Sequence, residues 1–123
     1  MINLDKIIID TSSILFALSK KIDIFESARI ELAMVPLVSK GIVNELSRMS
    51  KGSGRKAKDA KVAIAMVKSH KVAINPNSTY VDDWILSQAG TGTAVCTNDT
   101  DLRNNLRLKG AVVYTISEGG KFR

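Results

Sequence analysis

The sequence predicts an α/β fold, a three-layer α/β/α sandwich in which helices cover both faces of a central, mostly parallel five-stranded sheet. Two observations lead to this prediction. Short runs rich in β-branched residues alternate along the chain with longer segments of helical periodicity. Parallel strands need crossover connections of about a dozen residues, which are usually helices. In such folds, functional side chains are expected just after the carboxyl ends of the strands.

The first half of the chain contains two strand patterns and three helix patterns. The expected elements are a strand at 7–9, helices at 11–18 and 23–32, a strand at 34–38 and a helix at 40–49. Three consecutive isoleucines predict a first strand buried on both faces. Ile24, Ala28 and Leu32 recur at helical spacing, and Ser39 is a good cap for the helix after it. Pro36 favours an edge strand or a strand start, because proline lacks a backbone N–H.

The second half repeats the alternation after the loop SKGSG at 50–54. The expected elements are a helix at 55–69, a strand at 71–74, a turn at 75–78, a helix at 80–89, a strand at 93–96, a helix at 100–109 and a strand at 111–116. The last five residues, GGKFR, favour a frayed end.

Length and composition limit the domain organisation and the compartment. With 123 residues, of which 45% are hydrophobic, the chain suits a single domain spanning 1–123. The longest apolar run, 62–67, is far shorter than the ~18 residues of a membrane span, and no secretory signal is visible. We therefore expect a cytoplasmic protein with no membrane partner. The single cysteine, Cys96, excludes an internal disulfide and a thiolate zinc cage and favours a core position.

Two aspartates follow predicted strands. Asp10 comes directly after the first strand, and Asp99 follows the fourth strand after two polar residues. Each could cap the helix that begins next to it, which is a common role of aspartate. The other role open to each is that of a ligand or a catalytic group at the carboxyl edge of the sheet, although for either residue alone the cap is the simpler explanation.

The helix predicted at 80–89 carries two neighbouring carboxylates. At 100° per residue, Asp82 projects between Ile85 and Ala89 toward the protein, whereas Asp83 points to the helix flank. An inward carboxylate needs a cation or a metal as a partner, unless the backbone N–H groups of the first helical turn satisfy it.

A fourth acid, Glu45, borders the apolar stripe of the helix at 40–49. Its ordinary role would be a surface pair with Arg48, three residues later. A group of Asp and Glu without histidine suits hard, oxygen-seeking cations, for which Mg²⁺ and Mn²⁺ are the candidates. The only histidine, His70, lies at a helix end, where we expect it to be solvated.

Four segments of the chain carry a resemblance to the PIN-domain ribonuclease family. They are IIIDTSSIL at the first strand, IVNEL around Glu45, YVDDWILSQA around Asp82 and TNDTDLR after the fourth strand. Their order and spacing agree with the family over nearly the whole chain. The resemblance is closest to small single-domain archaeal members, in which a Gly/Lys loop precedes a basic helix as SKGSGRKAKDA does here. The zinc ribbon of some RNA-processing relatives is missing.

The resemblance implies roles for individual residues. Asp10, Glu45, Asp82 and Asp99 would form a catalytic acidic quartet, with Asp101 as a frequent fifth member. Asp10 and Asp99 would hold the principal Mg²⁺ or Mn²⁺, with Asp82 bound directly or through water. Glu45 and Asp101 would complete a second site or orient the nucleophile. Ser12, which replaces an asparagine of many relatives, and the pair Thr97 and Asn98 would hydrogen-bond the ligands from behind.

The net charge of +6 favours an anionic partner, and we expect RNA. If five of the twelve acids gather in one cleft, eighteen positive charges face seven negative ones on the rest of the surface. The residues expected to contact phosphates are Arg55, Lys56, Lys58, Lys61, Arg103 and Arg107. For the run at 55–61, a merely solvated helix face remains an equal alternative.

The sequence thus favours a metal-dependent endoribonuclease that acts in RNA processing or as a toxin. The alternative is a non-catalytic RNA-binding module on the same fold. A receiver domain would need an aspartate after the third strand, and an Asp-x-Asp phosphatase would need one two residues after Asp10, where Ser12 stands. An antitoxin, a ribosome-assembly partner or a second copy of the chain are the possible protein partners.

Overall fold

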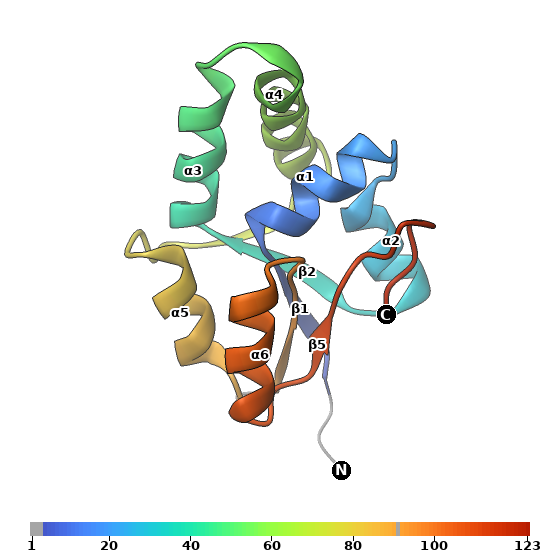
Figure 1. Cartoon of the computed structure of the whole chain (residues 1–123), viewed down its shortest axis with the longest axis vertical. Coiled ribbons are helices and arrows are strands. Elements are labelled where there is room, and N and C mark those ends of the chain that lie inside the picture. Colours follow the sequence, from blue (N-terminus) through green and yellow to red (C-terminus); the bar gives the residue numbers. More distant parts are fainter. Residues whose placement is uncertain (1–3, 91) are drawn as a thin grey trace.

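A single sheet organises the computed structural model, which describes residues 4–90 and 92–123 (Figure 1). All its strand pairs are parallel, and the order is β3-β2-β1-β4-β5. The strands are β1 (Lys6–Ile9), β2 (Val35–Ser39), β3 (Ala73–Asn75), β4 (Thr93–Cys96) and β5 (Val113–Tyr114). The predicted fold class is confirmed. The third strand lies one to two residues later than predicted, and the fifth is shorter.

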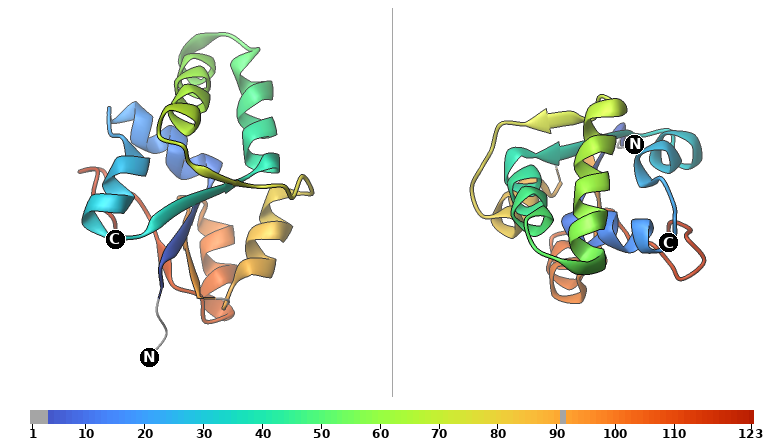
Figure 2. Two further views of the ribbon diagram at one scale, coloured as in Figure 1. Left: turned by 180° about the vertical axis from the view of Figure 1, so that it is seen from behind. Right: turned by 90° about the horizontal axis from the view of Figure 1, so that it is seen from above.

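Six helices connect the strands. They are α1 (Thr11–Ser19), α2 (Ile24–Glu31), α3 (Lys40–Ser50), α4 (Gly54–Ser69), α5 (Val81–Gln88) and α6 (Thr100–Leu108). The chain moves outward from β1 to β3 and then returns to β4, so right-handed crossovers place α1 and α2 on one face and α5 and α6 on the other (Figure 2). The α3–α4 pair stands above the carboxyl ends of the strands (Figure 1). In the described residues, no helix is both long and apolar enough to cross a membrane.

The core is built around the two central strands. Ile7, Ile8 and Ile9 of β1 are fully buried, as predicted for a strand covered on both faces. Each buried isoleucine contributes about 1.5–3 kcal/mol to folding. Cys96 at the end of β4 is also buried, and this burial raises the pKa of its thiol to about 12. The cysteine is therefore an unreactive core residue, as expected.

Pro36 is the second residue of β2 and so lies at a strand start, one of the two positions predicted for it, although β2 itself lies between β1 and β3 and not at an edge. The strand β3 pairs only with the segment from Leu37 to Ser39. Pro36 therefore precedes the part of β2 that is flanked on both sides, so its missing N–H leaves no sheet hydrogen bond unmade.

The C-terminus is folded into a hairpin, so the prediction of a frayed end is wrong. The backbones of Thr115 and Arg123 exchange two hydrogen bonds of 3.0 and 2.9 Å, and Ile116 pairs with Phe122 in an antiparallel bridge. Gly120 closes the turn with φ of +79°, and a Cβ there would lie 1.9 Å from a side-chain atom of Ile22. Only glycine suits this position, since it combines a left-handed conformation with close packing.

Candidate active site

The candidate site lies where the chain reverses its direction across the sheet, between β1 and β4. These strands are parallel neighbours with Ile9 opposite Cys96, and the N–H of Asp10 donates to the Cys96 carbonyl at 2.9 Å. The residues after both strands therefore start side by side. Such a switch point is where α/β sheets bind ligands.

Asp10 is almost completely buried, with 5% of its surface exposed. It occupies the cap position of α1 but makes no side-chain capping bond. Its Oδ2 instead accepts hydrogen bonds from the Ser12 hydroxyl at 2.9 Å and the Thr97 hydroxyl at 2.8 Å. Both hydrogen bonds end on Oδ2, so neither hydroxyl binds the second carboxylate oxygen, Oδ1. The capping role that the sequence left open for this side chain is not used.

Burial raises the pKa of Asp10 above its ordinary value of 3.8, and the negative charge of Asp99 raises it further. The hydroxyls of Thr97 and Ser12 act in the opposite direction, because they stabilise the ionised carboxylate, but burial outweighs them. Asp10 is thus an acid whose negative charge is not fully compensated by its own surroundings.

The residues 97–99 form a hydrogen-bonded support behind the site. Thr97 is fully buried, and its hydroxyl oxygen also accepts from the backbone N–H of Asp99 at 3.1 Å. The backbone N–H of Asn98 donates to the Ser12 hydroxyl at 3.1 Å. Ser12 and Thr97 therefore contact Asp10 directly, and both hold the loop that follows β4.

The Asn98 side chain does not make the hydrogen bonds to the acidic residues that the sequence led us to expect. It does not hydrogen-bond a carboxylate, but accepts from the Ser13 hydroxyl at 2.7 Å and from the backbone N–H of Ile116 at 3.0 Å, and donates to the Ile116 carbonyl at 2.9 Å. Asn98 thereby ties α1 to the segment after β5. Ser13 was missed in the sequence because a buried serine has no periodic signal of its own.

Asp99 combines two of the roles considered for it. Its Oδ1 accepts from the backbone N–H of Leu102 at 2.9 Å and so caps α6, while its charge acts on Asp10. Asp101 lies in the first turn of α6 and is exposed. It is not among the main charges that raise the pKa of Asp10 or Asp82, so the structure does not join it to the cluster.

Asp82 brings a third acid to the site from the first turn of α5. It is half-buried, whereas Asp83 is exposed, as the helical projection predicts. Partial burial raises the pKa of Asp82, and the charges of Asp10, Asp99, Glu45 and Asp83 raise it further, in that order. Four acids from four different elements are therefore within electrostatic reach of one another.

Glu45 reaches the site from α3, which lies close to the segment before α5. A Cβ at Gly41 would lie 3.0 Å from the Thr79 carbonyl oxygen, so glycine permits this close approach. Glu45 lines a cavity of about 310 Å³ with neighbours that include Arg48 and Tyr80. In the described residues, Glu45 and Arg48 do not form the ion pair that served as its ordinary explanation.

None of the four acids, all of them in the described part of the chain, is paired with a lysine or arginine. Their carboxylate oxygens also do not crowd together, because no three of them come within 4.8 Å of one another. The arrangement is a loose cluster of acids within electrostatic reach of one another, which could take a divalent ion with some acids bound through water.

The basic residues expected to contact RNA lie mostly on the surface. Arg55, Lys56, Lys58 and Lys61 are exposed on α4, and Arg107 is exposed on α6. Arg103 differs, since it is half-buried and its Nε has no hydrogen-bond partner.

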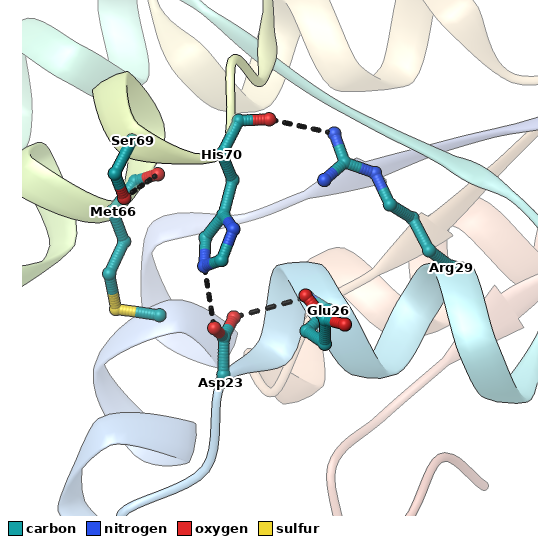
Figure 3. Close-up of polar contacts among 6 residues, drawn as sticks. All are labelled: Asp23, Glu26, Arg29, Met66, Ser69 and His70. Atoms are coloured by element: carbon teal, nitrogen blue, oxygen red, sulfur yellow. Dashed lines mark hydrogen bonds and ion pairs between the residues drawn. The ribbon is translucent and has the colours of Figure 1, made fainter.

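A second group of possible metal ligands, separate from these acids, lies between α2 and the end of α4 (Figure 3). The Nε2 atom of His70 lies 2.6 Å from Asp23 Oδ2, and Asp23 Oδ1 accepts from the Glu26 backbone N–H at 3.1 Å. The Arg29 guanidinium donates to the His70 carbonyl at 3.0 Å. His70 is therefore a contact between helices and not a solvated helix end as expected.

This fold and site define a class of protein: a doubly wound α/β domain with a group of carboxylates at its switch point. A family model described as a PIN like domain matches residues 7–118, and the chain belongs to this family. The resemblance found in the sequence is confirmed.

Solved structures agree with this assignment. The PIN domain endonuclease Utp24 is 28% identical, with a TM-score of 0.79 over 96% of this chain and 89% of that chain. A domain of a functionally unknown protein from Methanocaldococcus jannaschii is 18% identical, with a TM-score of 0.56 over 92% of this chain and 91% of that one, and shares the fold. No curated protein matches the chain. The family and the likeness to an endonuclease support a nuclease.

Proposed function

We propose that this chain is a metal-dependent endoribonuclease that hydrolyses RNA phosphodiester bonds, with Asp10, Glu45, Asp82 and Asp99 in its active site. One observation carries the proposal: three other acids raise the pKa of Asp82 at the switch point, and none of the four has a cationic partner among the residues that the structure describes. A protein that needed these residues only for folding would pair or disperse them.

The donor set fits Mg²⁺ or Mn²⁺. All candidate ligands are carboxylate oxygens, which these hard cations prefer, and His70 lies in the separate group with Asp23. Asp10 and Asp99 would hold the principal ion, with Asp82 as a direct or water-mediated ligand. Glu45 would contribute to a second ion. A bound cation would activate a water molecule and neutralise charge on the phosphoryl oxygens and the leaving oxygen.

The chain's own residues prepare the site for that chemistry. The hydroxyls of Ser12 and Thr97 fix the Asp10 carboxylate, and the capping bond to Leu102 fixes Asp99. Such preorganisation avoids rearrangement at the moment of reaction. Glu45, which is half-buried and lines a cavity, would orient a water molecule. The exposed cations of α4 and α6 would hold the phosphates of RNA.

Incubation of the purified protein with a structured RNA, in Mn²⁺ or Mg²⁺ and in EDTA, tests the proposal. We expect internal cleavage with metal, none with EDTA, and none with Asp10→Asn. RNA binding without cleavage by the parent would instead favour a non-catalytic RNA-binding module. No cleavage and no binding would reject both functions.

A further inference from the structure

A groove between α1 and α4 opens directly beside the acidic site. It has a volume of about 540 Å³, and one wall consists of Ser12, Leu15, Phe16 and Ser19. These four positions have the spacing of a single helix face. The groove begins at Ser12, whose hydroxyl donates to Asp10. A ligand that occupied it would therefore extend away from the acidic residues along α1.

The wall on α1 offers an apolar and partly aromatic surface. Leu15 and Phe16 are only half-buried, so part of each side chain faces the groove. Lys20 places its ammonium 5.5 Å from the centre of the Phe16 ring, and it is also paired with Glu118 at 2.7 Å. An accessible aromatic ring beside a cation is a common platform for a nucleobase, whatever the base is.

The opposite wall belongs to the first turns of α4 and carries Arg55, Lys56 and Asp59. The first turn of α4 contains no acidic residue, although the helix dipole favours acids there and opposes cations. Arg55 and Lys56 are therefore exposed cations at a helix end that does not stabilise them. A phosphate group placed there would meet these two cations and the N-terminus of a helix, against the single acid Asp59 on the same wall.

We propose that this groove binds one nucleotide of single-stranded RNA next to the cleaved phosphate. Its base stacks on Phe16, and Arg55 and Lys56 contact its phosphates. This subsite rests on the proposed nuclease function and adds a substrate contact to it. A nucleotide fits because it is flat and apolar at its base and anionic at its phosphate, which matches the two walls. An acidic peptide lacks the flat base that the wall on α1 suits.

Binding of a short fluorescent oligouridine by the Asp10→Asn variant tests the aromatic wall without cleavage of the probe. Adding Phe16→Leu keeps the apolar volume and removes the ring, so we expect affinity to fall about five- to one-hundred-fold, the usual effect of losing one stacked base. Ile30→Ala is the matched control, because Ile30 is a large apolar residue, 72% exposed, on α2. It should leave affinity unchanged.

The salt dependence of the same binding reaction tests the cationic wall. Replacing both Arg55 and Lys56 by alanine should reduce the slope of log affinity against log salt by about 1.4, since each phosphate contact on a single strand contributes about 0.7. Both side chains are exposed, so the variant should keep the melting temperature of the parent.

A tryptophan at the same position makes the stacking visible. Phe16→Trp should retain binding, and oligouridine should quench its emission, whereas the native Trp84 is 4% exposed and supplies a constant background. The subsite is wrong if the Phe16→Leu change leaves the affinity of the Asp10→Asn variant for oligouridine unchanged and if oligouridine does not quench the emission of Phe16→Trp. In that case, RNA cleavage by the parent would still support the proposed nuclease. Absence of both cleavage and binding in the parent would reject both.

Discussion

Two groups of acidic side chains in this molecule contain similar residues and differ in how their charge is compensated. In the group between α2 and α4, Asp23 uses one oxygen to cap α2 and the other to contact His70. In the group at the carboxyl edge of the sheet, Asp10 and Asp82 have raised pKa values and no cationic partner among the described residues.

The comparison shows that the presence of acids does not by itself identify a functional site. The Asp23 group has the tighter ligand geometry, with all three ligand atoms within 4.8 Å, yet its hydrogen bonds explain it as a clamp between two helices. The sheet-edge group is wider but stores unfavourable charge, which a folded protein retains when a ligand or a reaction needs it.

The largest expected effect is a loss of RNA cleavage when the acidic group at the sheet edge is changed. Asp10→Asn should lower RNA cleavage by at least about 10²-fold, since losing even an outer partner of a metal ligand costs 10–100-fold. The same change should leave the melting temperature unchanged or raise it, because the carboxylate is buried and faces the charge of Asp99. Initial cleavage rates and calorimetric melting measure both. A large loss of stability with full activity would make Asp10 a structural residue.

Asp99→Asn sharpens this test, since asparagine caps a helix about as well as aspartate. We expect the loss of cleavage seen with Asp10→Asn while α6 keeps its cap. Asp99→Ala should lose the cap in addition and destabilise the protein by about 1 kcal/mol. Urea unfolding of the two variants separates the charge from the hydrogen bond. Equal activity of Asp99→Asn and the parent would contradict the proposed role.

Thr97→Val removes the buried hydroxyl that donates to Asp10 and accepts from the Asp99 N–H. Leaving these groups without that partner should cost about 1–3 kcal/mol of unfolding free energy and reduce cleavage. Thr11→Val is the matched control, because the Thr11 hydroxyl is buried without any hydrogen-bond partner. That change should be neutral or stabilising. Similar effects of the two variants would show that the hydroxyl of Thr97 does not position Asp10.

Asp23→Ala breaks the clamp between α2 and α4. The loss of the helix cap and of the His70 contact should lower the unfolding free energy by about 1–2 kcal/mol. Cleavage per folded molecule should not change, because the clamp lies outside the acidic site. Urea unfolding and cleavage rates well below the melting temperature check both expectations, and a lost activity would place the clamp in the active site.

The smallest effect concerns pH in the absence of metal. In the unfolded chain Asp10 titrates near 3.8, whereas burial raises its pKa in the folded protein. The folded state therefore holds more protons between these two values, and stability falls as the pH rises through this interval and stays lower above it. Urea unfolding in EDTA from about pH 4 to about pH 8 should show that Asp10→Asn gains stability relative to the parent. Parallel stability profiles of the two proteins would contradict the raised pKa of Asp10.

The sequence predicted the fold well because burial on both faces and helical periodicity act locally. The three isoleucines of β1 and the apolar stripes of the helices needed no tertiary information. The C-terminal hairpin was missed, since it depends on the packing of Gly120 against Ile22, which no local pattern encodes. Pro36 lies at a strand start as predicted, but the position of β2 inside the sheet depends on its pairing with β3 and could not be predicted locally.

The acidic residues of the candidate site could be predicted from the sequence, but the hydrogen bonds that hold them in place could not. The positions of Asp10 and Asp99 after parallel strands, and the inward projection of Asp82, followed from strand order and helix geometry. Which hydroxyl holds which oxygen depends on contacts between residues about 85 apart, such as Ser13 with Asn98. The contact of His70 with Asp23 joins residues 47 apart in the sequence and could also not be found from spacing.

The most direct test of the account is calorimetric titration of Mn²⁺ into the parent, Asp10→Asn and Asp23→Ala. If the sheet-edge group holds the ion, the parent and Asp23→Ala bind Mn²⁺ with similar affinity, and Asp10→Asn loses the binding. If Asp10→Asn binds like the parent while Asp23→Ala does not, the ion belongs to the clamp between α2 and α4, and the account of the active site is wrong.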